Sequence, residues 1–344
     1  MLVPDLGDVM KIDAGISGNL SSAADEARRL EQLGYDGLKV AELTHDPFLP
    51  LTIAAEHTKD IELVTSVAVA FARNPMNMCL LAHDLNAFSS GRLVLGLGTQ
   101  VKPHIVNRFG MPWYKAPRQM REYLAAMEAI FDCWYEGEPL DFEGEYYRHT
   151  LMPKTFTPTN TSAGRPRILL SATGPMMTKV AAEASDGLIM HPFSTEQYIR
   201  EVNLPAIEQG LAVSGLSRKD YEIDYAPMIA TGDSEEDINR GIEVIKDRLA
   251  FYGSTPGYRS VLELHGWGEL QTELNFLMKQ RRQDEMAGLI SDEVLHAFAI
   301  IGEPEAVADE IVRRFSGLVD RTSFVAPGLS DDRTAEMLVR LRGG

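Results

Sequence analysis

The stretch RILLSATGPMMTKVAAEASDGLIMHP, residues 167–192, decides the fold. The run Arg167–Ala172 predicts a strand, because apolar residues dominate it. The segment that follows has apolar residues at helical spacing up to Ala184, and Gly187–Pro192 predicts another strand. Two strands joined by one helix form a parallel β-α-β unit. The same alternation continues from this unit toward both ends of the chain.

Eight strand-and-helix units in 344 residues favour a closed (β/α)8 TIM barrel. The strands are continuous apolar runs, as expected of a parallel sheet that is covered on both faces. A doubly wound open sheet is the alternative, but only the barrel makes an eighth strand routine. The predicted strands are Lys11–Ile16, Gly37–Glu42, Ile61–Ala70, Arg92–Thr99, Arg167–Ala172, Gly187–Pro192, Tyr221–Ala230 and Arg321–Pro327.

Residues 1–344 are predicted to form one barrel domain with two long insertions. The first insertion follows strand four, at about 100–166, and the second follows strand seven, at about 233–300. Connections of this length usually carry function or partner contacts.

Composition and charge exclude several classes of protein. The chain is 44% hydrophobic and 24% charged, which is typical of a globular protein. A net charge of −17 argues against broad binding to nucleic acid or to anionic membranes. No transmembrane run and no signal peptide are present in the sequence, so we expect a soluble cytoplasmic protein. The two cysteines and the histidine spacings match no metal site, and no metal is expected.

In a barrel of this kind the active site lies where strands end and the following loops begin. His45 and Asp46 follow the second strand. A neighbouring carboxylate can tune a histidine for proton transfer near neutral pH. However, Asp46 before Pro47 could equally start the next helix. The spacing alone leaves both interpretations open.

The segment after strand five has the features of an anion site. Thr-Gly-Pro leads directly into a helix, and Pro175 suits its first position. The free N–H groups of Met176 and Met177 would then face a ligand. An ordinary helix start is the alternative. The GLGT segment, residues 96–99, is no dinucleotide fingerprint, because Val101 stands where the third glycine is needed.

Five blocks of the sequence resemble the bacterial luciferase-like family of flavin- and deazaflavin-dependent oxidoreductases. Their order and spacing are more specific than any one block, and the resemblance spans nearly the whole chain. The most similar branch depends on coenzyme F420, a deazaflavin. The blocks are EARRLEQLGYDGLKVAE (26–42), TSVAVAFARNPM (65–76), GRLVLGLGT (91–99), RFGMPW (108–113) and ATGPMMTKVAAEASDGLIMHPF (172–193).

The resemblance implies where the cofactor lies. A non-prolyl cis peptide, matching the bond Ser66–Val67, would form a bulge that backs the tricyclic ring. Thr99 would lie near the ring or the ribityl chain, and the cofactor phosphate would lie at the helix after strand five. The cofactor-binding residues predicted in this way are Ser66, Val67, Thr99, Ala172, Gly174, Pro175, Met176 and Met177.

The resemblance further implies an oxidoreductase that moves a hydride between F420 and a small organic substrate. His45 is the predicted proton-transfer residue, and Glu42 is expected to orient it. Homodimers are common in the family, and they pack helices near strands two to four. The predicted substrate-pocket residues are Phe71, His104, Trp113 and His191.

Two alternative functions remain open on the sequence. The first is a two-component monooxygenase that takes reduced FMN from a separate flavin reductase and activates oxygen. The second is a non-catalytic flavin-binding barrel. It is supported by Gln100-Val101-Lys102, which stands where many deazaflavin dehydrogenases of the family carry a glutamate.

Overall fold

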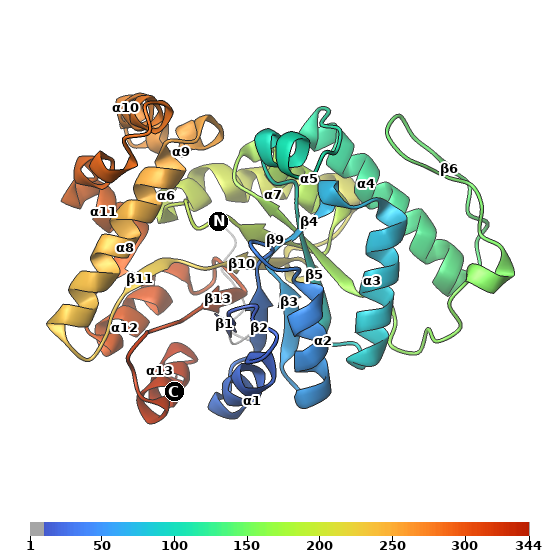
Figure 1. Ribbon diagram of the computed structural model, residues 1–344, viewed down its shortest axis with the longest axis horizontal. Coiled ribbons are helices and arrows are strands. Elements are labelled where there is room, and N and C mark those ends of the chain that lie inside the picture. The colour runs from blue at the N-terminus through green and yellow to red at the C-terminus, as the bar shows by residue number, and fades with distance from the viewer. Residues whose placement is uncertain (1–9, 344) are drawn as a thin grey trace.

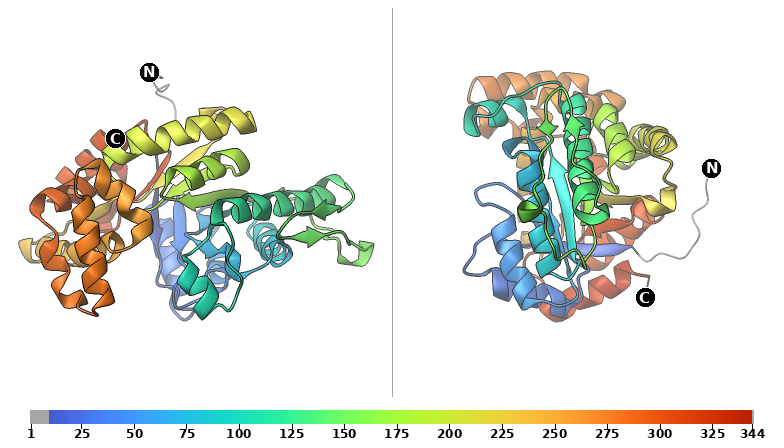
Figure 2. Two further views of the ribbon diagram at one scale, coloured as in Figure 1. Left: turned by 90° about the horizontal axis from the view of Figure 1, so that it is seen from above. Right: turned by 90° about the vertical axis from the view of Figure 1, so that its right-hand side faces the viewer.

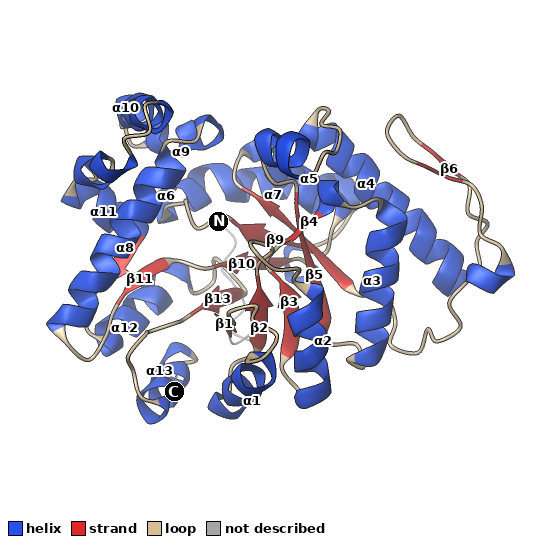
Figure 3. Ribbon diagram, in the orientation of Figure 1, coloured by secondary structure: helices blue, strands red, loops and turns tan. Residues whose placement is uncertain are grey.

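A closed ring of parallel strands forms the centre of the computed structural model, which describes residues 10–343. Each strand pairs with the next, β13 pairs with β1, and β3 pairs with β5, so that the ring has no free edge. Helices surround the ring (Figure 1, Figure 3), and the predicted (β/α)8 TIM barrel is confirmed. The ring contains β1 (Lys11–Gly15), β2 (Gly37–Val40), β3 (Glu62–Thr65) continued by β4 (Ala68–Val69), β5 (Leu93–Gly98), β8 (Arg167–Ala172), β9 (Gly187–Met190), β10 (Glu222–Tyr225) and β13 (Arg321–Ser323).

In the described part of the chain, eight helices cover the outside of the ring and bury apolar side chains against it. In α1, Ala27 and Leu30 are buried against the core, and the helix ends at Gly34, whose φ of 88° favours glycine. In α3, the Asn74 side chain accepts the Asn77 N–H and starts the helix before Pro75. The covering helices are α1 (Ala23–Leu33), α2 (Phe48–His57), α3 (Pro75–Phe88), α4 (Ala116–Phe131), α5 (Pro175–Ala184), α7 (Leu204–Ser214), α12 (Pro304–Phe315) and α13 (Asp331–Leu341).

Two predicted strands are each divided in the structure. The third is interrupted between β3 and β4 by the cis peptide bond Ser66–Val67. The seventh ends at Tyr225, because Pro227 has no N–H to continue the ladder. The segment beyond it, β11 (Met228–Ala230), leaves the ring and pairs with β12 (Ala299–Ile301), a strand that the sequence did not reveal.

The two insertions lie on opposite sides of the barrel (Figure 1, Figure 2). The first contains a π-helical turn, His104–Arg108, then α4 and a hairpin of β6 (Phe142–Glu143) and β7 (Arg148–His149). The second has an apolar cluster of its own, which includes Leu249, Leu274 and Phe298. Among residues 10–343, no helix combines the length and apolar character that crossing a membrane requires. The second insertion contains α8 (Glu235–Gly253), α9 (Arg259–Leu264), α10 (Gly268–Lys279) and α11 (Asp292–Phe298).

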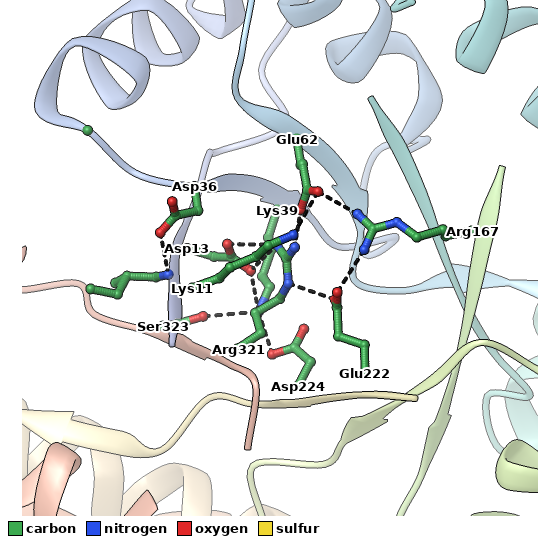
Figure 4. Close-up of polar contacts among 12 residues, drawn as sticks. Lys11, Asp13, Asp36, Lys39, Glu62, Arg167, Glu222, Asp224, Arg321 and Ser323 are labelled. Carbon is green, nitrogen blue, oxygen red and sulfur yellow. Dashed lines mark hydrogen bonds and ion pairs between the residues drawn. The ribbon is translucent and has the colours of Figure 1, made fainter. Parts of the chain in front are cut away.

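The interior of the ring has an apolar half and an ionic half. Val64, Val94, Leu169 and Ile189 pack together on one side. On the other side Arg321 is fully buried, and Figure 4 shows carboxylates on several sides of it. This interior is a packed core, so a ligand must bind above it, at the ends of the strands.

In the ionic half, Arg321 forms direct ion pairs with the carboxylates around it. The Arg321 guanidinium donates to both oxygens of Asp13, at 2.8 and 2.9 Å, and to Glu222 at 2.9 Å, and it also pairs with Glu62. Burial alone would raise the pKa of Glu62, but Arg321 and Arg167 outweigh it and hold this pKa at about 2.

A glycine makes room for this arrangement. A Cβ atom at Gly37 would lie 2.5 Å from Nη1 of Arg321 and would also overlap the Asp13 carboxylate. Lys39, two residues further along β2, pairs with Asp224 at 2.7 Å and with Asp13 at 3.1 Å. The apolar run that predicted β2 therefore contains a buried cation that the sequence pattern did not reveal.

Candidate functional site

The loop after β2 is held in place by one arginine. The Glu42 carboxylate accepts Arg73 Nη1 at 2.7 Å and the Val69 N–H at 2.8 Å. The other terminal nitrogen of Arg73 donates to Asp46 at 2.7 Å. The Arg73 guanidinium also lies over the Phe48 ring, 5.7 Å from its centroid. These contacts fix the β2 loop against the end of β4, a role for Arg73 that sequence reasoning missed.

His45 is exposed on this loop, beside the loop that follows β1. A Cβ atom at Gly18 would lie 3.6 Å from the His45 side chain. Asp46 accepts the Phe48 N–H at 2.9 Å, so it does support the start of α2. Among the described residues, Glu42 accepts hydrogen bonds from Arg73 and Val69, and no hydrogen bond joins it to His45. The orienting role of Glu42 and the proton-transfer role of His45 both stay predictions.

A bulge at the end of strand three forms one part of the rim. The Ser66–Val67 peptide bond is cis, as the resemblance implied. Val67 is half-buried and packs against the apolar half of the interior. A Cβ atom at Gly98 would lie only 2.6 Å from Cγ2 of Val67, and one at Gly96 would overlap the Thr65 carbonyl oxygen. The G-x-G of β5 therefore serves close packing around the bulge.

Thr99 follows directly on the neighbouring strand. It is half-buried, and its hydroxyl donates to the Gln100 carbonyl at 2.9 Å. Gln100 has a φ of 58°, which turns the chain away from the barrel and into the first insertion. Thr99 thus lies at the rim on the strand between the bulge and α5, because β5 pairs with both β4 and β8.

The start of α5 forms the third part of the rim. Gly174 is its N-cap, in extended conformation with φ −83° and ψ 158°, and no side chain caps the helix there. The N–H groups of the first helical turn have no partner within a helix, and the dipole adds positive potential. A Cβ atom at Gly174 would meet nothing within 4 Å. The position of that Cβ is therefore open, and the Met176 side chain is exposed beside it.

The carbonyl groups of Thr173 and Gly174 in the same turn accept hydrogen bonds from helix residues. The Gly174 carbonyl accepts the N–H and the hydroxyl of Thr178, each at 3.1 Å. Asn203 Nδ2 donates to the Thr173 carbonyl at 3.3 Å and to the Thr178 hydroxyl at 3.2 Å. Asn203 and Thr178 thus fix the turn, and Ala172 before it is buried in β8. This arrangement fits an anion such as a phosphate.

The predicted substrate residues fall into three places. Phe71 and Trp113 contact each other edge-on, with ring centroids 5.6 Å apart. Phe71 is buried, so only the half-buried Trp113 has surface to offer a ligand. His104 is exposed in the first insertion, at the start of the π-helical turn. That turn is tied to the β2 loop, because Arg108 donates to the Leu43 carbonyl at 2.6 Å.

His191 lies at the end of β9 and contacts the second insertion. Its ring is 4.7 Å from the ring of Tyr252 and 4.6 Å from that of Tyr258. Burial lowers the pKa of His191 to about 4, so the imidazole is neutral at physiological pH. Sequence reasoning missed both tyrosines, because they come from a helical insertion more than 50 residues away with no motif of its own.

Residues 7–321 match the model of the luciferase-like monooxygenase family. The chain belongs to this family. It is 46% identical over 312 residues to an uncharacterized protein of Mycobacterium tuberculosis, covering 91% of this chain and 92% of the relative. It is 30% identical over 267 residues to a 5,10-methylenetetrahydromethanopterin reductase of Archaeoglobus fulgidus, covering 76% and 75%. It is 29% identical over 345 residues to an F420-dependent glucose-6-phosphate dehydrogenase of Intrasporangium calvum, covering 93% and 94%.

Solved structures of low identity share the fold. The coenzyme F420-dependent tetrahydromethanopterin reductase of Methanopyrus kandleri superimposes with a TM-score of 0.77 at 20% identity, covering 96% of this chain and 97% of the other. The family match and the sequence relatives support an oxidoreductase that uses a flavin or a deazaflavin.

Proposed function

We propose that the chain is an F420-dependent oxidoreductase that transfers a hydride between the deazaflavin and a small organic substrate. The observation that carries the proposal is the order of three features along neighbouring strands of the rim. The bulge at Ser66–Val67, Thr99 and the α5 turn at Gly174 follow one another. F420 has a tricyclic ring, a ribityl chain and a phosphate in the same order.

The residues present fit that group at both ends. Val67 offers an apolar, rigid surface on the bulge for a flat ring. The α5 turn offers N–H groups that no side chain caps, which suits a phosphate. When bound, the deazaflavin supplies the hydride chemistry. The chain itself binds and orients the ligands, and His45 on the β2 loop is the proposed site of proton transfer.

The relatives favour one cofactor, whereas the shape of the rim suits two. The relatives at 29–30% identity include an F420-dependent dehydrogenase, which favours F420. FMN also has a tricyclic ring and a phosphate, so an FMN-dependent monooxygenase with a separate flavin reductase would use the same rim. The glutamate missing after strand four is the support for a non-catalytic barrel, and turnover with F420 would exclude it.

Gly174→Asp should lower the affinity for F420 without lowering the stability of the protein. An aspartate at an N-cap accepts the free N–H groups, and in place of glycine it stabilises the helix by about 0.2–0.5 kcal/mol. The same carboxylate would occupy the phosphate position, so F420 affinity should fall by about 10-fold or more. Calorimetry for stability and a fluorescence titration for binding check both effects. Gly174→Ala is the control, because its Cβ meets nothing within 4 Å, and it should bind F420 normally.

Gly98→Ala should disturb the ring surface. The added methyl would lie 2.6 Å from Cγ2 of Val67, whose branched side chain has little freedom to move. Overpacking of this kind costs about 1–3 kcal/mol, so we expect weaker F420 binding by about 10-fold together with a lower melting temperature. Gly288→Ala, where a Cβ meets nothing within 4 Å, is the matched control. Unchanged F420 affinity in Gly98→Ala would remove Val67 from the cofactor site.

A homodimer through α2 and α3 is part of the proposal. Leu49 on α2 and Leu80, Leu81 and Phe88 on α3 are exposed, whereas Met78 on the same helix is buried in the core. Sedimentation velocity should show a dimer at micromolar concentration, and Leu80→Asp combined with Leu81→Asp should yield monomers. A monomeric wild-type protein would contradict this part of the proposal.

A further inference from the structure

A crevice of about 400 Å³ lies where the second insertion meets the barrel. Pockets for small molecules have volumes of about 300–1,000 Å³, so the crevice is large enough for one. It is bounded by the segment after β9, which contains α6 (Glu196–Tyr198), and by the ends of α9, α11 and α12. These helices lie on the same side of the molecule (Figure 1). The charged residues and the histidine that bear on its chemistry are Glu196, Arg200, Glu201, His265, Arg313 and Arg314.

A hydrogen bond joins the two walls of the crevice. The hydroxyl of the buried Thr195, just before α6, lies 2.8 Å from Nε2 of His265 in the second insertion. The His265 ring also stacks on Trp267, with centroids 4.6 Å apart and an angle of 14° between the planes. The segment after β9 is therefore tied to the insertion at the crevice itself.

Arg314 presents a guanidinium to the crevice from the last turn of α12. Its side chain is only 19% exposed, and its Nε donates to Glu310 at 2.6 Å. Within the described residues 10–343, its terminal nitrogens form no hydrogen bond. Glu310 is already held by Nε and Nη2 of Arg313, at 2.6 and 2.7 Å. The free fork of Arg314 matches the two oxygens of a carboxylate.

Glu201 provides a negative charge in the same crevice. One oxygen of its carboxylate accepts the Gln197 side chain at 3.0 Å, and no ion pair to Glu201 is formed by the described residues. Glu196, in contrast, is paired with Arg200 at 2.9 Å. A ligand with two negative charges would face the free Glu201, whereas a positively charged group would be attracted to it. The crevice therefore suits a molecule that carries one charge of each sign.

We propose that this crevice binds a free α-amino acid. Its carboxylate pairs with the Arg314 guanidinium, and its ammonium group pairs with the Glu201 carboxylate. No residue of the crevice belongs to the bulge, to Thr99 or to the α5 turn. The site is thus separate from the proposed cofactor site, and the inference does not rest on the proposed function.

Three probes that differ by one charged group test the proposal. They are leucine, 4-methylpentanoate, which lacks the ammonium group, and 3-methylbutylamine, which lacks the carboxylate. Each is titrated into the purified full-length protein in a calorimeter at pH 7. Leucine should bind at least about 10-fold more tightly than either of the other two. The proposal is overturned if leucine binds no more tightly than 4-methylpentanoate or 3-methylbutylamine.

Two variants should each affect one end of the ligand. Arg314→Gln should weaken leucine binding by about 10-fold or more and leave 3-methylbutylamine unaffected. Arg314→Lys keeps the charge without the fork, so it should recover part of that loss. Glu201→Gln still accepts the Gln197 side chain; it should weaken leucine binding by about 10-fold and leave 4-methylpentanoate unaffected. Leucine affinity equal to that of the wild type in Arg314→Gln would overturn the proposal.

Surface variants outside the crevice serve as matched controls. Arg240→Gln removes an exposed arginine that pairs with Glu236 and Asp237 on α8. Glu208→Gln removes an exposed carboxylate on α7. Both should bind leucine as the wild type does. Arg314→Gln should fold normally, because Glu310 keeps its two hydrogen bonds from Arg313. F420 affinity should be the same in all these variants, so a failure of F420 binding would not touch the amino-acid site.

Discussion

Replacing Arg321 with methionine should lower the free energy of unfolding by about 3–5 kcal/mol. Arg321 is fully buried and contacts Asp13, Glu62 and Glu222. Without the guanidinium, Asp13 keeps Lys39 as a partner, the two glutamates keep Arg167, and Glu62 also keeps Lys11. The buried Asp13 and the half-buried Glu62 and Glu222 then have too few cationic partners, and their desolvation is no longer compensated. Equilibrium unfolding in urea measures the loss.

The matched control is Arg340→Met, because Arg340 pairs with Asp309 on the surface with both side chains about half exposed. Such a pair contributes about 0–1 kcal/mol. Adding Asp13→Asn to Arg321→Met should restore part of the lost stability, since it removes one uncompensated charge. Equal losses for Arg321→Met and Arg340→Met would show that the buried network is unimportant for stability.

The loss of unfolding free energy in Arg321→Met, relative to wild type, should also depend on pH. The pKa of Glu62 is about 2 in the folded protein, below its ordinary value of 4.5. A depressed carboxyl pKa contributes stability that is present above the ordinary value and is lost as the pH falls toward the folded value. Arg321→Met lacks the guanidinium that contributes most to lowering the pKa of Glu62, so its stability should change less as the pH falls. The difference in unfolding free energy between wild type and variant should therefore be largest near neutral pH and narrow below about pH 4.5.

His45→Asn should lower kcat by about 10²–10⁴-fold, the usual contribution of a general acid or base. F420 affinity should stay unchanged, because the residues proposed to hold the cofactor come from other strands. His45 is exposed on the β2 loop, so its removal should leave stability within about 0.5 kcal/mol. Steady-state kinetics on the substrate that the wild type turns over measures the effect.

His57→Asn is the control for this variant. His57 is also exposed, at the end of α2, where its Nδ1 lies 2.9 Å from the Ile53 carbonyl oxygen. It should retain the wild-type kcat. Wild-type kcat in His45→Asn would remove the proton-transfer role from His45 and would turn attention to the Glu42, Arg73 and Asp46 cluster.

The barrel could be predicted because its strands are local patterns. Runs such as Arg167–Ala172 are apolar along their whole length, and the structure has that strand with the same bounds. The β11–β12 pair could not be predicted in this way. Ala299–Ile301 has three residues and follows a helix without a break, and its partner lies about 70 residues earlier. Short strands that pair across such a separation leave no local signal.

In the candidate site, too, features with a local sequence pattern could be predicted, and contacts between distant loops could not. The cis bond at Ser66–Val67 was expected from the family resemblance and is present. The α5 turn followed from the Thr-Gly-Pro sequence and the helical pattern after it. Arg73 and Tyr258 could not be assigned to the site, because their partners are set by tertiary packing between loops. The bond from Arg73 to Glu42 could not be predicted for the same reason, and the expected role of Glu42 toward His45 stays a prediction.

A direct binding titration tests the central claim that this rim holds F420. Tryptophan fluorescence of the purified protein would be followed against F420 and against FMN, each oxidised and reduced. Trp113→Phe would serve as a control for the signal, because Trp113 is half-buried near the predicted pocket. We predict that F420 binds at least about 10-fold more tightly than FMN in either redox state. Selective binding of reduced FMN, or no binding of either cofactor, would contradict the account.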